Sequence, residues 1–201
     1  RNSQLESHIH NRSMNKEEYY NMYKLENNFW WYKTLHSLII SIVKQKKKAS
    51  TSILDAGCGT GRLVELLNDL GEVTGLDFSE EAIHLSKKRG LKNVFTEDLN
   101  TWESKEKYNI ITSIDVLYHS AIKEDTLILQ KFYKSLSNEG TLILNLPAFN
   151  SLKRDHDEVV HTKRRYVKKN LVNKLESIGF TVQKASYRLP HLYIIIILRK
   201  F

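Results

Sequence analysis

Seven consecutive residues combine backbone freedom with one acidic side chain: Asp55, Ala56, Gly57, Cys58, Gly59, Thr60 and Gly61. They follow the short apolar run 52–54 and precede a segment with helical apolar spacing, so they connect a strand to a helix. Glycine is needed where a chain turns sharply or where a ligand approaches the backbone closely. The N–H groups at the start of the following helix attract a carboxylate or a phosphate. The run therefore predicts a ligand-binding loop.

The glycine spacing separates this loop from two other nucleotide-binding loops. A dinucleotide-binding loop reads Gly-x-Gly-x-x-Gly, whereas Gly57, Gly59 and Gly61 are each two residues apart. This spacing disfavours an NAD-linked oxidoreductase. No Gly-Lys-Ser/Thr follows, which excludes a P-loop.

Two further acidic residues follow later strands of the same pattern. Asp77 ends the segment 72–77, about 20 residues past the loop, where one carboxylate can accept both hydroxyl protons of a ribose diol. Phe78 follows directly and can pack on a planar ring, and Asp98 follows the next expected strand. A single acid at such a place is often a surface turn residue. Three acids at the carboxyl ends of strands indicate a ligand site, since ligands of open α/β sheets bind at that edge.

This arrangement resembles the class I S-adenosylmethionine (SAM) dependent methyltransferases, whose first motif reads Asp/Glu-x-Gly-x-Gly-x-Gly. The resemblance covers about residues 53–187 and implies SAM as cofactor and S-adenosylhomocysteine (SAH) as product. It implies that Asp55 orders the loop or meets the SAM ammonium through water, and that Asp98 accepts from the adenine amino group. The expected cofactor-binding residues are Asp55, Ala56, Gly57, Cys58, Gly59, Asp77, Phe78, Asp98, Leu99 and Ile114.

The segment 113–119, which reads Ser-Ile-Asp-Val-Leu-Tyr-His, borders the transferred methyl group in this family. It is not the Asn/Asp-Pro-Pro-aromatic motif of enzymes that methylate base amino groups, so we expect no DNA partner. Tyr118 stands where some metal-binding relatives have glutamate, so we expect no metal. His119 can act as a general base near neutral pH. It can equally be a structural histidine that hydrogen-bonds a loop.

A polar stretch, residues 149–168, interrupts the alternation of strands and helices. It is long for a connection without secondary structure, which is typical of a substrate lid. Two histidines and a basic cluster within it suit a polar substrate, and they equally suit a solvated loop. If the methyl acceptor is oxygen, we expect His119, His156 or His161 to take its proton.

The pattern as a whole resembles a bacterial and archaeal methyltransferase group often found with genes for polysaccharide or lipid-linked sugar assembly. The matching features are the aromatic run 29–31, His156-Asp157, His161-x-x-Arg164-Arg165-Tyr166 and Gly179-Phe180. Relatives commonly carry paired arginines after the tryptophans, where this chain has Leu35 and His36. Most of the early aromatic residues are expected to pack a helix on the sheet. Trp31 and Tyr32 are the candidates to close over SAM.

The elements that must position these residues alternate along the chain. Two helices are expected within residues 16–43, and a helix at 169–177 near the other end. Between them, strands are expected at 52–54, 72–77, 93–96, 108–114 and 141–146, with helices at 62–70, 79–88 and 123–136. A strand at 181–187 follows, and 193–198 is a last strand or the start of an apolar helix. This alternation and the resemblance together predict an α/β Rossmann-like three-layer sandwich, with a mostly parallel seven-stranded sheet and helices on both faces.

Composition bounds the class of protein. A chain of 201 residues with a single cysteine, Cys58, fits one domain in a reducing cytoplasm. Much of the net charge of +8 lies in short lysine-rich runs, which favours a solvated surface over an RNA-binding face. Residues 1–13 lack the apolar core of a signal peptide and resemble a vector-derived tail. We expect 14–48 to form a helical cap and 49–201 the SAM-binding core.

These observations predict methyl transfer from SAM to a small molecule or to a glycan or lipid-linked intermediate, at oxygen. RNA methylation and SAM binding without catalysis are the alternatives. The apolar run 194–198 is too short to span a bilayer, but it can support peripheral membrane association.

Overall fold

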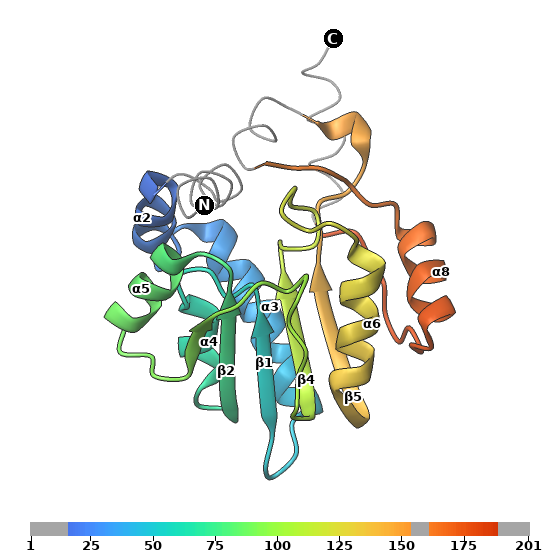
Figure 1. Cartoon of the computed structure of the whole chain (residues 1–201), viewed down its shortest axis with the longest axis horizontal. Coiled ribbons are helices and arrows are strands. Elements are labelled where there is room, and N and C mark those ends of the chain that lie inside the picture. The colour runs from blue at the N-terminus through green and yellow to red at the C-terminus, as the bar shows by residue number, and fades with distance from the viewer. Residues whose placement is uncertain (1–15, 154–160, 189–201) are drawn as a thin grey trace, which may run out of the picture.

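The computed structural model describes residues 16–153 and 161–188. In this part of the chain a parallel five-stranded sheet is covered by helices on both faces (Figure 1). The strand order is β3-β2-β1-β4-β5. The chain adds β2 and β3 on one side of β1 and then returns to add β4 and β5 on the other side. The strands are β1 Ser52–Ala56, β2 Glu72–Asp77, β3 Val94–Thr96, β4 Tyr108–Ile114 and β5 Leu136–Asn145.

The helices divide between the two faces of the sheet. They are α2 Lys16–Leu25, α3 Trp30–Lys46, α4 Arg62–Leu67, α5 Glu80–Lys88, α6 Asp125–Ser135 and α8 Lys168–Ile178, with a short 3-10 helix η1 Asn150–Leu152. One core lies beneath α3, α4 and α5, and the other lies beneath α6 and α8. Helix α2 stands apart from the sheet and packs on α5 (Figure 1), where Tyr19 contacts Ala82 and Leu85.

Alternate residues of the central strands β1 and β4 enter the two cores. Ile53 and Ile110 belong to the α3 side, whereas Leu54 and Ile111 pack with Phe132 on the α6 side. Both faces of the sheet are thus covered, which is why the central strands are apolar almost throughout. Complete burial of such a side chain stabilises the fold by about 1.5–3 kcal/mol.

Local signals for helix ends and strand starts were mostly reliable. Ser79 caps α5, since its Oγ accepts from the Ala82 N–H at 3.3 Å. Gly179, with φ +117°, ends α8. Strand β5, in contrast, begins at Leu136 rather than near residue 141. Leu136 pairs with Tyr108, and a register shift then passes over residues 137–140, so that regular pairing resumes where Thr141 meets Ile110.

The prediction of seven strands is wrong for the part of the chain that the structure describes, which contains five. Residues 181–187, expected as a strand, form no regular element. A strand needs backbone partners, and no hydrogen bond of the described backbone joins this segment to β5. Most of its side chains are exposed, so burial does not hold it on the sheet. The run 193–198 and the tail 1–13 lie outside the described residues. No helix in the described ranges is long and apolar enough to cross a membrane.

Candidate functional site

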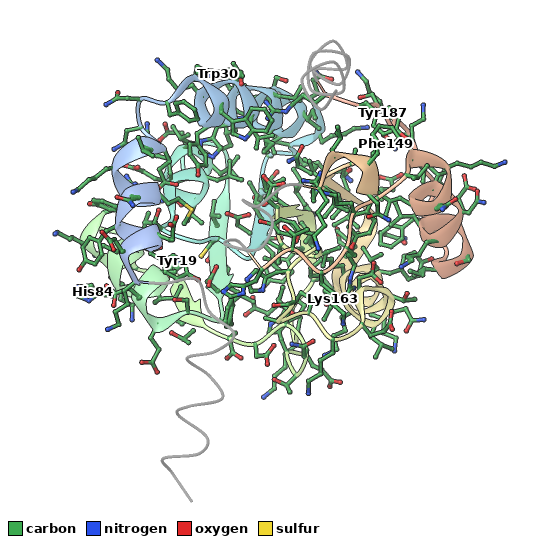
Figure 2. All side chains as sticks on the ribbon, turned by 90° about the horizontal axis from the view of Figure 1, so that it is seen from above. Tyr19, Trp30, His84, Phe149, Lys163 and Tyr187 are labelled. Carbon is green, nitrogen blue, oxygen red and sulfur yellow. The ribbon has the colours of Figure 1, made fainter. Side chains whose placement is uncertain are left out.

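The glycine loop lies at the carboxyl edge of the sheet, where the chain passes from β1 to α4; Figure 2 looks down on this edge. The Gly57 and Cys58 N–H groups both donate to the Leu76 carbonyl, at 2.7 and 2.8 Å. Gly57 has φ +89°, and a Cβ there would lie 2.2 Å from a Val116 methyl carbon. Left-handed backbone and close packing therefore both require glycine at this position.

Asp77 connects the loop to β2. Its Oδ2 accepts from the Gly59 N–H and its Oδ1 from the Ser79 N–H, each at 2.9 Å. The side chain is buried, and burial raises its pKa. A carboxylate has more acceptor positions than these two N–H groups use, so Asp77 retains capacity for ligand hydroxyls.

Asp55 is buried beneath the loop at the end of β1. The Thr112 hydroxyl donates to its Oδ1 at 2.7 Å. Burial, together with the negative charges of Asp77 and Glu26, raises the pKa of Asp55 to about 7 against the lowering effect of Thr112. The mutual repulsion of these acids favours a cationic ligand nearby.

A polar clamp that sequence reasoning missed holds the other end of the loop. The Thr60 hydroxyl donates to the Glu26 carboxylate, which also forms a buried ion pair with Arg89 at 2.5 Å. The Arg89 Nε donates to the Thr60 carbonyl at 2.8 Å. Glu26 follows α2 and Arg89 follows α5, so nothing in their local sequence indicates that they meet. The clamp connects the N-terminal helices to the glycine loop.

The residues expected to hold an adenine are placed unequally. Phe78 is half-buried, with its ring centre 5.9 Å from that of His119. Ile114, at the end of β4, is also half-buried. Asp98 is exposed, and its Oδ1 accepts from the backbone and side-chain nitrogens of Asn100. Leu99 is buried in the core on the α6 side of the sheet, so its side chain can support the expected adenine site only from the core side.

His119 has one satisfied ring nitrogen and one unsatisfied one. Its Nδ1 accepts from the Ala121 N–H at 3.0 Å. Its Nε2 is buried and has no hydrogen-bond partner within the described ranges. Burial, with a smaller contribution from His161, lowers the pKa of His119 to about 4. The ring is therefore neutral at pH 7, and because Nδ1 accepts, Nε2 carries the hydrogen.

The second half of the polar insertion docks against the segment that follows β4. The Ser120 N–H donates to the His161 carbonyl at 2.9 Å, and Thr162 forms an antiparallel bridge with His119. The rings of His119 and His161 are 5.6 Å apart. His156 lies outside the described residues. Among the residues described, no three His, Cys, Asp or Glu side chains are grouped to hold a metal.

Trp31 and Tyr32 lie in the first turn of α3. Tyr32 is half-buried, and the guanidinium carbon of Arg188 lies 4.0 Å from the centre of the Trp31 ring. Sequence reasoning missed Arg188, which is separated from α3 by most of the chain.

Comparisons with known proteins agree with this geometry. A family model described as a methyltransferase domain matches residues 47–188. The chain belongs to this family. The methyltransferase domain has the class I fold: the magnesium protoporphyrin IX methyltransferase of Synechocystis PCC 6803, solved with bound SAH, superposes with a TM-score of 0.61 at 22% identity, over 77% of this chain and 75% of that one.

Two curated relatives differ in what they are named for. A malonyl-[acyl-carrier protein] O-methyltransferase of Bacillus anthracis is 29% identical over 157 residues, which are 73% of this chain and 55% of the relative. A human protein named as a probable tRNA methyltransferase 9B is 29% identical over 80 residues, which are 40% of this chain and 17% of that protein. The chain spans about half the length, or less, of the curated relatives that it matches.

Proposed function

We propose that this methyltransferase domain transfers a methyl group from SAM to an oxygen atom of a small molecule or of a glycan or lipid-linked intermediate, leaving SAH. The observation that carries the proposal is the set of buried acids around the glycine loop, Glu26, Asp55 and Asp77. Only Glu26 among them has an ion-pair partner within the described ranges. SAM presents a cationic sulfur and an ammonium group, whereas a dinucleotide presents an anionic pyrophosphate. The charge at the site therefore favours SAM.

The side chains at the sheet edge fit this cofactor. The loop residues Ala56 to Gly59 would hold the methionine part, with Asp55 beneath them. Asp77 would accept from the ribose, and Phe78, Asp98 and Ile114 would contact the adenine, with Leu99 supporting them from the core. Bound there, SAM would supply a methyl group that is attached to a cationic sulfur. The leaving group is the neutral thioether SAH.

The protein's own contribution is positioning and exclusion of water. Methyl transfer is an in-line displacement, which depends mainly on how acceptor, methyl and sulfur are aligned. The His119 Nε2–H supports a role as hydrogen-bond donor toward the bound molecules, because its Nδ1 already holds the Ala121 N–H. In this proposal His161 and His156, rather than His119, are the candidates to take a proton from an acceptor hydroxyl.

RNA methylation is the second candidate. It is favoured by a pocket of about 480 Å³ between α6, α8 and the docked insertion. The lining holds two acids, Glu124 and Asp125, the second of which pairs with Arg164 and Lys174, and five cations: Lys123, Lys163, Arg164, Arg165 and Lys174. The name of the human relative points in the same direction. Small-molecule methylation at oxygen is preferred, because the B. anthracis relative, an O-methyltransferase by name, matches a larger share of this chain.

Calorimetry with SAM, SAH and NAD tests the cofactor proposal. We expect SAM and SAH to bind, NAD not to bind, and Asp77→Ala to abolish binding. Asp69→Asn, an exposed acid past the end of α4, is the matched control and should bind SAM normally. Absence of SAM binding at millimolar concentration would refute the proposal.

A screen for SAH release over an acceptor panel tests the reaction. If SAM binds but no acceptor yields a product, the result would favour a protein that binds SAM without catalysis. RNA affinity that falls steeply with salt, together with methylated RNA, would favour the second candidate.

A further inference from the structure

The guanidinium group of Arg188 contacts the first turns of α3 in two ways, through one face of its plane and through one of its nitrogens. Its guanidinium carbon lies 4.0 Å from the Trp31 ring centre, within the range of a cation–π contact. Its Nη1 donates to the Thr34 hydroxyl at 3.2 Å. These two contacts fix the plane of the guanidinium at the end of the described chain.

The remaining Nη2 of Arg188 is buried and has no hydrogen-bond partner in residues 16–153 and 161–188. Leaving a buried donor unsatisfied destabilises the fold, and more so when the group is charged. Burial also lowers the pKa of Arg188. An orphaned charged donor of this kind is unusual in a folded protein and needs an explanation.

Arg89 shows what a structural arginine looks like in the same molecule. All three of its nitrogens are bonded: Nε to the Thr60 carbonyl, Nη1 to Asn27, and Nη2 to Glu26 and the Tyr23 carbonyl. Arg188 shares the aromatic contact of Arg89, whose guanidinium lies 4.2 Å from the Tyr23 ring, but it lacks the complete set of acceptors. The difference indicates that Arg188 is prepared for a partner that residues 16–153 and 161–188 do not supply.

The surroundings of Arg188 connect it to the segment that follows β4. Arg188 is within electrostatic reach of Asp115, which directly follows β4 and precedes Val116, the residue packed on Gly57. Next to Arg188 in sequence, Tyr187 stacks on Phe149 with ring centres 4.7 Å apart (Figure 2). The cation thus lies on the Trp31 ring, next in sequence to the Tyr187–Phe149 pair and within electrostatic reach of the residue that follows β4.

We infer that Arg188 binds an anionic group, a carboxylate or a phosphate, on the molecule that receives the methyl group; this rests on the proposed function. The guanidinium is a planar fork whose N–H groups match both anions. The neighbouring rings suit an acceptor with an apolar or aromatic body. Arg188 is then a specificity determinant for anionic acceptors.

Calorimetry on the SAH-saturated protein tests this inference with three probes: benzoate, phenyl phosphate and neutral benzamide. We expect at least one anion to bind wild-type protein and benzamide not to bind. Arg188→Gln should weaken anion binding at least tenfold. Arg188→Lys, which keeps the charge without the fork, should weaken it less. The matched control is Lys168→Gln, which removes a cation 5.7 Å from the Tyr187 ring and should leave anion affinity unchanged.

The affinity for SAH separates this test from that of the proposed function. Arg188 variants that bind SAH normally are folded, so a loss of anion binding then belongs to the anion site. A preference for benzoate or for phenyl phosphate identifies the anion class. Equal anion affinity in wild type and Arg188→Gln, or no anion binding to wild type, overturns the inference. A protein that fails to bind SAH contradicts the proposed function, and the anion titration without SAH still tests Arg188.

Discussion

Replacing Asp55 with asparagine is expected to change the stability of the ligand-free protein relative to wild type. This change should be more favourable at alkaline pH than at acidic pH. The carboxyl group is 2% exposed, and burial raises its pKa from 3.8 to about 7. Asparagine retains an oxygen that can accept from the Thr112 hydroxyl, so the packing is largely conserved. The variant removes the charge and little else.

The size of the effect follows from the two pKa values. Because the folded pKa is raised, the folded state holds the proton more tightly than the unfolded state does. Below about pH 4 both states are protonated and the carboxyl has no effect on stability. Between pH 4 and 7 the unfolded state ionises first, so the wild type loses stability as pH rises. A shift of about 3 units at 1.36 kcal/mol each gives about 4 kcal/mol at alkaline pH. About 3 kcal/mol of this arises between pH 5 and pH 8.

Urea denaturation of wild type and Asp55→Asn at pH 5 and pH 8 measures the difference. The buried amide of the variant adds a penalty of about 1–3 kcal/mol that is independent of pH. The result is therefore the amount by which the unfolding free energy of the variant, relative to wild type, differs between pH 5 and pH 8. Asp69→Asn, an exposed acid, should show almost no such change. If the stability of Asp55→Asn relative to wild type is the same at pH 5 and pH 8, the assignment of a buried, proton-binding Asp55 is incorrect.

Three further variants or measurements test other parts of the site. Gly57→Ala should lower the unfolding free energy by about 3 kcal/mol, since Val116 blocks its Cβ, whereas Gly90→Ala, at φ +90° with open space, should cost only about 1 kcal/mol; equal losses would count against the packing argument. Arg89→Met should cost about 3 kcal/mol by leaving Glu26 buried and unpaired, and adding Glu26→Gln should restore part of it in urea titrations; no recovery would contradict the clamp. The nitrogen NMR shifts of His119 should show the Nε2–H tautomer from pH 8 to pH 5.5, because its pKa is lowered to about 4; an imidazolium signal in that range would disprove this.

The sequence by itself determined the parallel α/β class and the position of the glycine loop between a strand and a helix. Both depend on local properties. Gly57, Gly59 and Gly61 all adopt positive φ, a conformation that glycine reaches without strain, so their spacing is readable in the chain. Apolar runs predict the strands because parallel strands are buried on both faces. The contact of Asp77 with this loop could be predicted, because Asp77 directly ends a strand whose neighbour carries the loop.

Only the tertiary structure decided which polar groups meet. The Glu26–Arg89 ion pair and the contact of Arg188 with Trp31 join segments that are far apart in the chain. The unsatisfied Nε2 of His119 depends on how deeply the tertiary structure buries that ring. Composition and spacing do not encode such contacts, because the packing of other elements brings the partners together. The same reason explains the missing strand at 181–187: β propensity is local, but a strand forms only where a partner edge accepts its hydrogen bonds.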